Sequence, residues 1–257
     1  MRADAPVDPL TPFHAVATIL RDGVAFSHVS ALRICEIEAP WPMDRDRRIH
    51  VVAPDRARRP KRPGIVAHGG GPASVMRFNG LLVTTPAQTW LHCSKVLPFA
   101  DLVVLGDAMM RRKNPATSLL TLRQITEAAF KTHGVIQARA ALPYLRPGTD
   151  SSMETRTRMV LVDAGLPCPA VNIRAYDEHG NFLALPDMSY PDLRIAIEYD
   201  GDIHRTDRAT WLRDVERRQR LEDAGWRIIT VTANDVRHPA RLIARVRTAI
   251  HTRQATT

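Results

Sequence analysis

Five acidic residues gather in the stretch LPDMSYPDLRIAIEYDGDIHR, residues 185–205. They lie in or beside two segments that otherwise have the composition of buried β-strands, and they are Asp187, Asp192, Glu198, Asp200 and Asp202. A strand that enters a core usually excludes charge, because an unpaired buried carboxylate is costly or changes its pKa. A divalent cation is one group that would compensate such a cluster.

Two of these acids are spaced so that they can meet across a pair of strands. Side chains alternate along RIAIEYD, residues 194–200, so Glu198 and Asp200 share one face of that strand. Ten residues separate Asp187 from Glu198, and antiparallel pairing across one turn can bring Asp187 alongside Glu198. Carboxylates that converge from adjacent strands form an all-oxygen site suited to Mg²⁺ or Mn²⁺. Hydrolysis of phosphodiester bonds is a reaction that such a site performs well.

The elements that would position these acids follow a seam at LRPGTDSS, residues 145–152, which interrupts helical patterns on both sides. Beyond it we predict the order α-β-β-β-α-β-α, in an α/β fold with a mixed sheet. The predicted segments are a helix over 151–165, a hairpin of strands over 171–177 and 182–190, a strand over 194–200, a helix over 206–225, a strand over 226–232 and a helix over 239–252.

The second part of the chain resembles a nuclease superfamily. The motif PD, followed by ten residues and then EYD, after a helix that carries Glu154, resembles the PD-(D/E)XK superfamily. More narrowly, PDMSYPDLRIAIEYDGDIH with RDVERRQRLEDAGWRIITVT resembles a bacterial domain family related to very-short-patch-repair (Vsr) endonucleases. The resemblance implies a restriction-endonuclease-like α-β-β-β-α-β core over residues 151–257 and Mg²⁺- or Mn²⁺-dependent cleavage of DNA.

Carried over to this sequence, the resemblance makes Asp187 and Glu198 the metal ligands and Glu154 the acid of the first helix. Asp200 takes the position where many superfamily members have a catalytic lysine, and no lysine follows Lys131. His204 is the best replacement as base or proton shuttle, because imidazole titrates near neutral pH. Asp200 is alternatively a further metal ligand.

Several of these residues also have a structural explanation. Glu154 follows Ser151 by three positions, as in a helix-capping box, and His204 could lie on a loop surface. Gln219 shares a stripe with Leu212 and Val215, which predicts that it faces the sheet and positions a phosphate or water.

The arginines of residues 208–220 have two explanations as well. Arg213 and Arg217 could follow a nucleic-acid backbone. Alternatively, the arginines of this helix form pairs with acids one turn away on a solvated face, such as Asp214 with Arg218.

The positive charge of the chain is concentrated before the seam. Residues 1–150 hold 20 Lys and Arg against 12 Asp and Glu, whereas residues 151–257 hold 16 against 15, within a total of +9. DRARRPKRPG, residues 55–64, reads as a basic loop between two strands, and either contacts phosphates or is simply solvated. Its basic residues are Arg56, Arg58, Arg59, Lys61 and Arg62.

The segment over residues 21–146 is predicted to form a smaller α/β and helical domain, after a tail over residues 1–20. A helix begins after Ser27, and Thr85 with Pro86 marks the start of another. FSHVSALRI, IHVVAP and GLLVTTPAQTWLHCS resemble the domain that follows the winged helix in AbiEi-type antitoxins. That resemblance implies a toxin or defence-system partner, although too few residues precede it for a winged helix.

The remaining composition indicates a cytoplasmic protein. The three cysteines are scattered, which favours reduced thiols over a disulfide framework or a zinc knuckle, and no apolar run is long enough to span a membrane. We therefore predict a cytoplasmic DNA endonuclease, with RNA as an alternative substrate. Its rival is a nuclease fold without cleavage that acts as a nucleic-acid-binding, antitoxin-like regulator. A hydrolase of small phosphates is a third interpretation, but HGGGP at residues 68–72 lacks the Lys-Ser/Thr of a P-loop.

Overall fold

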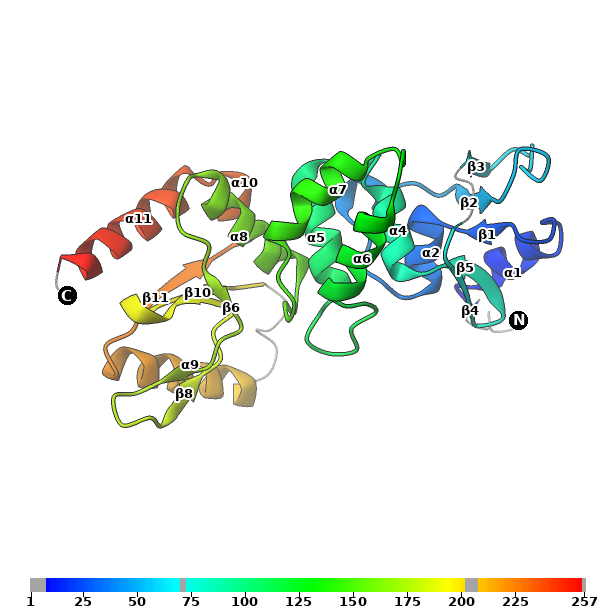
Figure 1. Cartoon of the computed structure of the whole chain (residues 1–257). Coiled ribbons are helices and arrows are strands. Elements are labelled where there is room, and N and C mark those ends of the chain that lie inside the picture. The colour runs from blue at the N-terminus through cyan, green and yellow to red at the C-terminus, as the bar shows by residue number, and fades with distance from the viewer. Residues whose placement is uncertain (1–7, 70–72, 202–207, 256–257) are drawn as a thin grey trace, which may run out of the picture. The chain divides into compact units, whose positions relative to one another are not determined.

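The computed structural model of the chain describes residues 8–69, 73–201 and 208–255. The protein has a mixed α/β fold, as predicted, and it divides into two compact units (Figure 1). The first unit is Met1–Met110 with Asn114–Leu145, and the second is Arg111–Lys113 with Arg146–Thr257. Among the described residues, none of the helices combines the length and the apolar character needed to cross a bilayer.

The first unit contains a five-stranded sheet in the order β3-β2-β1-β5-β4. Its strands are β1 (Ala25–Phe26), β2 (Ile49–Ala53), β3 (Ile65–Gly69), β4 (Val75–Phe78) and β5 (Leu81–Thr84). Its helices are α1 (Thr11–Ala17), α2 (His28–Ile34), α3 (Trp41–Asp44), α4 (Pro86–Cys93), α5 (Phe99–Met109), α6 (Leu119–Ala128), α7 (Val135–Ala141) and the 3-10 turn η1 (Leu142–Tyr144). Helix α2 packs on β2, β5 and α4.

A local signal explains the start of helix α4, and one prediction for this unit is wrong. Thr85 caps α4 by accepting a hydrogen bond from the backbone N–H of Gln88, and Pro86 occupies the first turn, as predicted. Residues 11–17 form α1, where a tail was expected. The reason is that Phe13 is buried and packs edge-on against Phe26 in the core of the sheet.

The second unit contains a four-stranded mixed sheet in the order β11-β10-β9-β6 and a separate two-stranded ribbon, β7-β8. Its strands are β6 (Ala170–Val171), β7 (Ala175–Tyr176), β8 (Phe182–Ala184), β9 (Met188–Tyr190), β10 (Ile195–Tyr199) and β11 (Arg227–Val231). Its helices are α8 (Ser152–Asp163), the 3-10 turn η2 (Pro191–Leu193), α9 (Arg208–Asp223), α10 (Ala233–Arg237) and α11 (Ala240–Gln254).

The predicted long hairpin is broken into two pieces. Asn172 has a φ of +48°, which ends β6, and the Pro186–Asp187 step separates β8 from β9. As a result, β7 and β8 form the ribbon, while β6 and β9 pair within the main sheet. Prolines and left-handed residues disrupt a ladder, so an apolar run that contains them forms two short strands.

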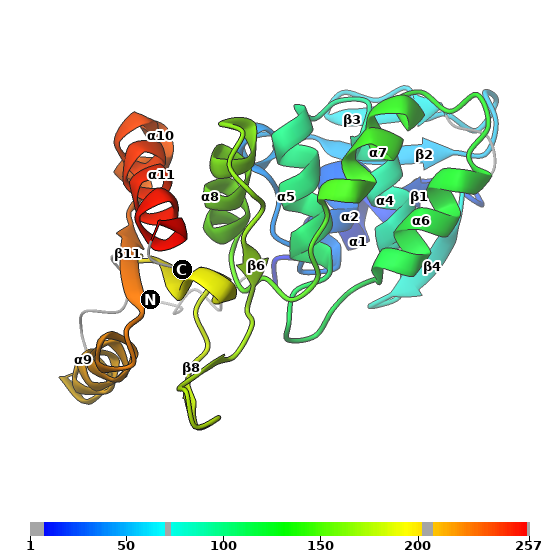
Figure 2. The ribbon, with the colours of Figure 1, turned by 60° about the vertical axis from the view of Figure 1, so that its left-hand side comes forward.

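Strand β10 lies at the centre of this unit and has a helix layer on each side. Ile195 and Ile197 pack with residues of α8 and α11, whereas Ala196 packs with Leu221 of α9 and with Trp226. Both views show α11 on one side of the sheet and α9 on the other (Figure 2). Alternation therefore directs Glu198, two positions after Ala196, towards α9.

Candidate functional site

The strand register places Asp187 opposite Glu198. Antiparallel pairing of β9 with β10 sets Met188 opposite Ile197, and the same register continued by one residue sets Asp187 opposite Glu198. The Oδ2 atom of Asp187 accepts a hydrogen bond from the backbone N–H of Tyr199 at 2.8 Å. The antiparallel pairing that the spacing predicted is confirmed.

Glu198 is buried and is compensated by arginines of α9. Arg217 donates to both carboxylate oxygens, with Nη1 at 2.6 Å from Oε1 and Nη2 at 3.1 Å from Oε2. Arg218 adds a second positive charge, with Nε at 3.6 Å from Oε2. Two-point pairing with a guanidinium is the strongest geometry for a carboxylate ion pair. These two arginines compensate the charge of buried Glu198 within the same unit.

Glu154 is buried at the start of α8. It takes part both in the helix cap and in the acidic cluster. Ser151 caps the helix by accepting from the N–H of Glu154, and its hydroxyl donates to Oε1 at 2.9 Å. The other oxygen, Oε2, accepts from the N–H of Asp150 at 3.0 Å. Burial and the charge of Asp187 raise the pKa of Glu154 to about 7, so the helix cap also lies within electrostatic reach of the acidic pair.

Asp187 is less compensated than Glu198. Burial raises the pKa of its carboxyl to about 6 against the lowering effect of the Tyr199 hydrogen bond, and the charge of Glu198 raises it further. Arg217 opposes this shift only as a charge. The cluster therefore has an excess of negative charge.

Asp150 extends the cluster and was not predicted to belong to it. Its carboxylate pairs with Arg112, whose Nε lies 3.0 Å from Oδ2, and its charge raises the pKa of both Glu154 and Asp187. Arg112 precedes the predicted seam by more than thirty residues, so nothing in the spacing linked the two.

The donor set of this cluster fits a hard divalent cation. Asp187, Glu198 and Glu154 offer only carboxylate oxygens, which Mg²⁺ and Mn²⁺ prefer. The raised pKa values of Glu154 and Asp187 are a physical sign that the site accommodates one more positive charge. Ser189 lies on β9, two residues after Asp187 and opposite Ala196 of β10. Its hydroxyl is buried and has no hydrogen-bond partner in the described part of the chain.

The other predicted site residues are dispersed. Asp200 is half-buried at the end of β10, where its N–H donates to the carbonyl of Val231, and His204 lies outside the described residues. Arg213 is exposed on α9. The basic residues Arg56, Arg58, Arg59, Lys61 and Arg62 are all exposed on the connection between β2 and β3, where Arg58 pairs with Asp55.

The orientation predicted for Gln219 is wrong. Gln219 is exposed and donates to Asp223 on the surface of α9 at 2.9 Å. The inward face of the helix instead carries Leu221, which is fully buried, with Arg217 one turn before it. Arg217 faces inward because it pairs with the buried carboxylate of Glu198. The side of the helix that carries Val215 and Gln219 therefore faces solvent.

The raised pKa values predict how stability depends on pH. The unfolded pKa of Asp187 is near 3.8 and the folded value is about 6. Its contribution to stability is therefore fully present below about pH 4 and is lost as the pH rises through about 6. We expect Asp187→Asn to stabilise the protein at pH 8 by roughly 2–3 kcal/mol, and to have little effect at pH 4.

Urea unfolding of both proteins from pH 4 to pH 8 checks this prediction. The difference between the two profiles isolates Asp187 from histidines that titrate in the same range. Asparagine retains an oxygen that can accept from Tyr199, so the native hydrogen bond is kept. Profiles that stay parallel between pH 4 and pH 6, with no difference in stability at pH 8, would contradict the raised pKa.

Comparison with known proteins identifies two relatives. The chain is 32% identical over 199 residues to "Uncharacterized protein MT2308" of Mycobacterium tuberculosis strain CDC 1551 / Oshkosh. It is equally similar to "Uncharacterized protein Rv2248" of strain ATCC 25618 / H37Rv, and each match covers 77% of this chain and 72% of the relative. No family model and no solved structure matches the chain. A match of this length includes residues of both units. The chain belongs to the protein family of these two mycobacterial proteins.

Proposed function

We propose that the protein is a metal-dependent endonuclease that hydrolyses phosphodiester bonds of DNA. The observation that carries this proposal is the convergence of Glu154, Asp187 and Glu198 on one buried place, where burial and mutual repulsion raise two of the three pKa values. Clusters of perturbed carboxyls of this kind are characteristic of catalytic sites.

Asp187 and Glu198 would hold Mg²⁺ or Mn²⁺, and Glu154 would support the site. When bound, the cation polarises the phosphate, lowers the pKa of an attacking water and stabilises the leaving oxygen. Asp187 is held in place through Oδ2 by the N–H of Tyr199, so the orientation of its carboxylate is set before a ligand arrives. Glu154 is fixed in the same way by the two contacts of its helix cap.

Arg217 would supply positive charge beside the acids, in a site that lacks the lysine with which many superfamily members position or activate the attacking water. Its side chain is partly exposed and its guanidinium touches Glu198, so it can neutralise a phosphate oxygen that approaches from solvent. Asp200 or His204 would transfer the proton of the attacking water. The exposed basic residues of the β2–β3 connection would bind the DNA backbone without sequence preference.

The biological setting belongs to the same proposal. The three cysteines are free, which suits the reducing cytoplasm. The AbiEi-like resemblance of the first unit favours a partner from a toxin–antitoxin or phage-defence system.

A second candidate function is a nuclease fold that binds nucleic acid without cutting it. The specific observation in its favour is that Arg217 engages both oxygens of Glu198, which would keep that carboxylate away from a metal. The absence of any lysine after Lys131 points the same way.

Cleavage assays distinguish the two functions. The purified protein is incubated with plasmid, single-stranded DNA and RNA, each with Mg²⁺, Mn²⁺ or EDTA. We expect cleavage of DNA that requires the metal and stops with EDTA. Binding of DNA in a gel-shift assay, with no cleavage under any condition, would replace the endonuclease by the regulator. Cleavage of RNA alone would keep the chemistry and change the substrate.

A further inference from the structure

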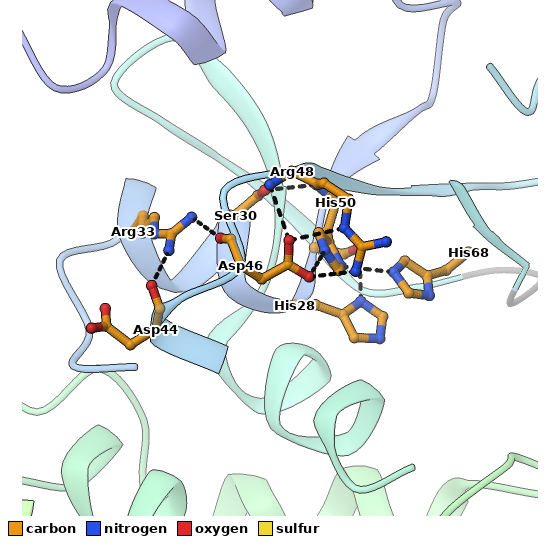
Figure 3. A network of polar contacts seen from close by, with 9 residues as sticks. His28, Ser30, Arg33, Asp44, Asp46, Arg48, His50 and His68 are labelled. Carbon is orange, nitrogen blue, oxygen red and sulfur yellow. Dashed lines mark hydrogen bonds and ion pairs between the residues drawn. The ribbon is translucent and has the colours of Figure 1, made fainter. Parts of the chain in front are cut away.

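Three histidines of the first unit converge although they are far apart in the sequence. His28 begins α2, His50 lies on β2 and His68 lies on β3. One ring nitrogen from each lies within 4.8 Å of the other two, and Figure 3 shows the three rings grouped together. Imidazole is the side chain that first-row transition metals bind most often in proteins.

The sheet explains why His50 and His68 meet. Strands β2 and β3 are parallel, and their register sets His68 opposite Val52, two residues after His50. Residues two apart share a face of a strand, so both histidines lie on the same side of the sheet. The Nδ1 atom of His50 lies 3.0 Å from the Nε2 atom of His68. Two nitrogens bound to one tetrahedral zinc ion are about 3.3 Å apart, given Zn–N distances of about 2.0–2.1 Å.

Asp46 sets which nitrogen of His50 is available. Its carboxylate lies 3.1 Å from Nε2 of His50 and is itself held by Arg48 at 3.0 Å and 2.7 Å (Figure 3). A carboxylate that accepts the Nε2 proton leaves Nδ1 with its lone pair directed at His68. Carboxylate–histidine pairs of this kind orient the ligands of metal sites.

His28 is placed in a similar way by Ser27. The Ser27 hydroxyl occupies the position of a helix cap, yet it makes no capping hydrogen bond and lies 3.0 Å from Nδ1 of His28. This contact leaves Nε2 of His28 for another partner. His28 also has a φ of +50°, a backbone conformation that residues other than glycine rarely adopt. Its ring is stacked on His68, with the ring centroids 3.7 Å and the planes 18° apart, so one ring must rotate about its side-chain bonds to direct both lone pairs at one ion.

The three imidazoles lie in a sheltered setting, in which His28 and His50 are buried and His68 is partly buried. Burial lowers the pKa of His28 to about 2 and that of His68 to about 4. Burial also lowers the pKa of His50, although Asp46 opposes the shift.

The cluster opens onto a cavity of about 530 Å³ in the same unit, which His28, His68 and His92 line together with Lys95. His92, on α4, adds a fourth imidazole next to His28, with the ring centroids 5.4 Å apart. The Nδ1 atom of His92 is buried and has no hydrogen-bond partner in the part of the chain that the structure describes. An ion held by three histidines would therefore have its open position towards a polar space.

We propose that His28, His50 and His68 bind one divalent transition-metal ion, Zn²⁺ by preference, with a fourth position left for water or a small anion from the cavity. Three protein ligands with an open position is the arrangement of zinc sites that bind substrates. This site is separate from the carboxylate cluster: its ligands are nitrogens of the first unit, and those of the proposed nuclease site are oxygens of the second.

Metal analysis of the full chain tests the proposal. The protein is stripped with a chelator, and Zn²⁺ or Co²⁺ alone is added and counted by mass spectrometry of the metal. We expect one tightly bound ion per chain, visible absorption from four-coordinate Co²⁺, and X-ray absorption from imidazole nitrogens at about 2.0–2.1 Å from zinc. An X-ray absorption spectrum of the bound zinc with no contribution from imidazole nitrogens would overturn the proposal, and this result needs no variant.

Matched variants identify the ligands. We expect His68→Gln and His50→Gln to weaken zinc binding at least ~10-fold, and Asp46→Asn to weaken it by ~10–100-fold through its effect on His50. His133→Gln is the control, because His133 lines the same cavity but is exposed and outside the cluster. Asp187→Asn controls for zinc held by the carboxylates. Unchanged affinity in folded His68→Gln protein, checked by circular dichroism, would refute the assignment.

Discussion

Replacement of Glu198 by glutamine is expected to lower metal-dependent DNA cleavage by about 100-fold or more. The change keeps the size of the side chain and one oxygen for Arg217, but it removes the charge that a cation would neutralise. The measurement is the initial rate of plasmid nicking in Mg²⁺, with urea unfolding to show that the variant is folded.

Asp192→Asn is the matched control for this experiment. Asp192 belongs to the same acidic stretch, but it is exposed on the turn η2, so its replacement is expected to leave the rate unchanged. Folded Glu198→Gln protein that cuts at the wild-type rate would show that Glu198 has no part in cleavage.

Replacement of Arg217 by alanine is expected to destabilise the protein by about 3–5 kcal/mol. In the variant, Glu198 stays buried, and among the described residues Arg218, at 3.6 Å, is the cation that remains paired with it. Removing one partner of a buried ion pair costs more than the pair itself contributes, because the remaining charge has lost its compensation. Urea unfolding near pH 7 measures the effect.

Two further variants give this second prediction its control. Arg220→Ala removes an exposed arginine of the same helix and is expected to change stability by less than about 0.5 kcal/mol. Adding Glu198→Gln to Arg217→Ala should restore much of the lost stability, because the uncompensated charge disappears. A loss below about 1 kcal/mol in Arg217→Ala would mean that water, and not the guanidinium, solvates Glu198.

Local patterns predicted those parts of the fold that depend on short stretches of chain. The Thr85–Pro86 start of α4 and the pairing of Asp187 with Glu198 both follow from spacing within about a dozen residues. Alternation along a strand and the geometry of a single turn are sufficient for such predictions.

The features that the sequence did not reveal depend on contacts between distant segments. The inward side of α9 could not be read from its apolar residues, because Arg217 turns inward only in response to Glu198 on another element. The three histidines meet only because β2 and β3 are parallel neighbours, a pairing that no turn between them specifies. Asp150 pairs with Arg112, which belongs to the second unit although it comes from an earlier part of the chain.

The most direct test of the proposed nuclease site is a comparison of Asp187→Asn with the wild-type protein, in which cleavage and stability are measured on the same samples at pH 8. If the cluster is destabilised so that it can hold a cation, the variant should be more stable than the wild type and should have lost Mg²⁺-dependent cleavage of plasmid DNA. A variant that cuts DNA as fast as the wild type, with stability unchanged, would contradict the assignment of the metal site to Asp187.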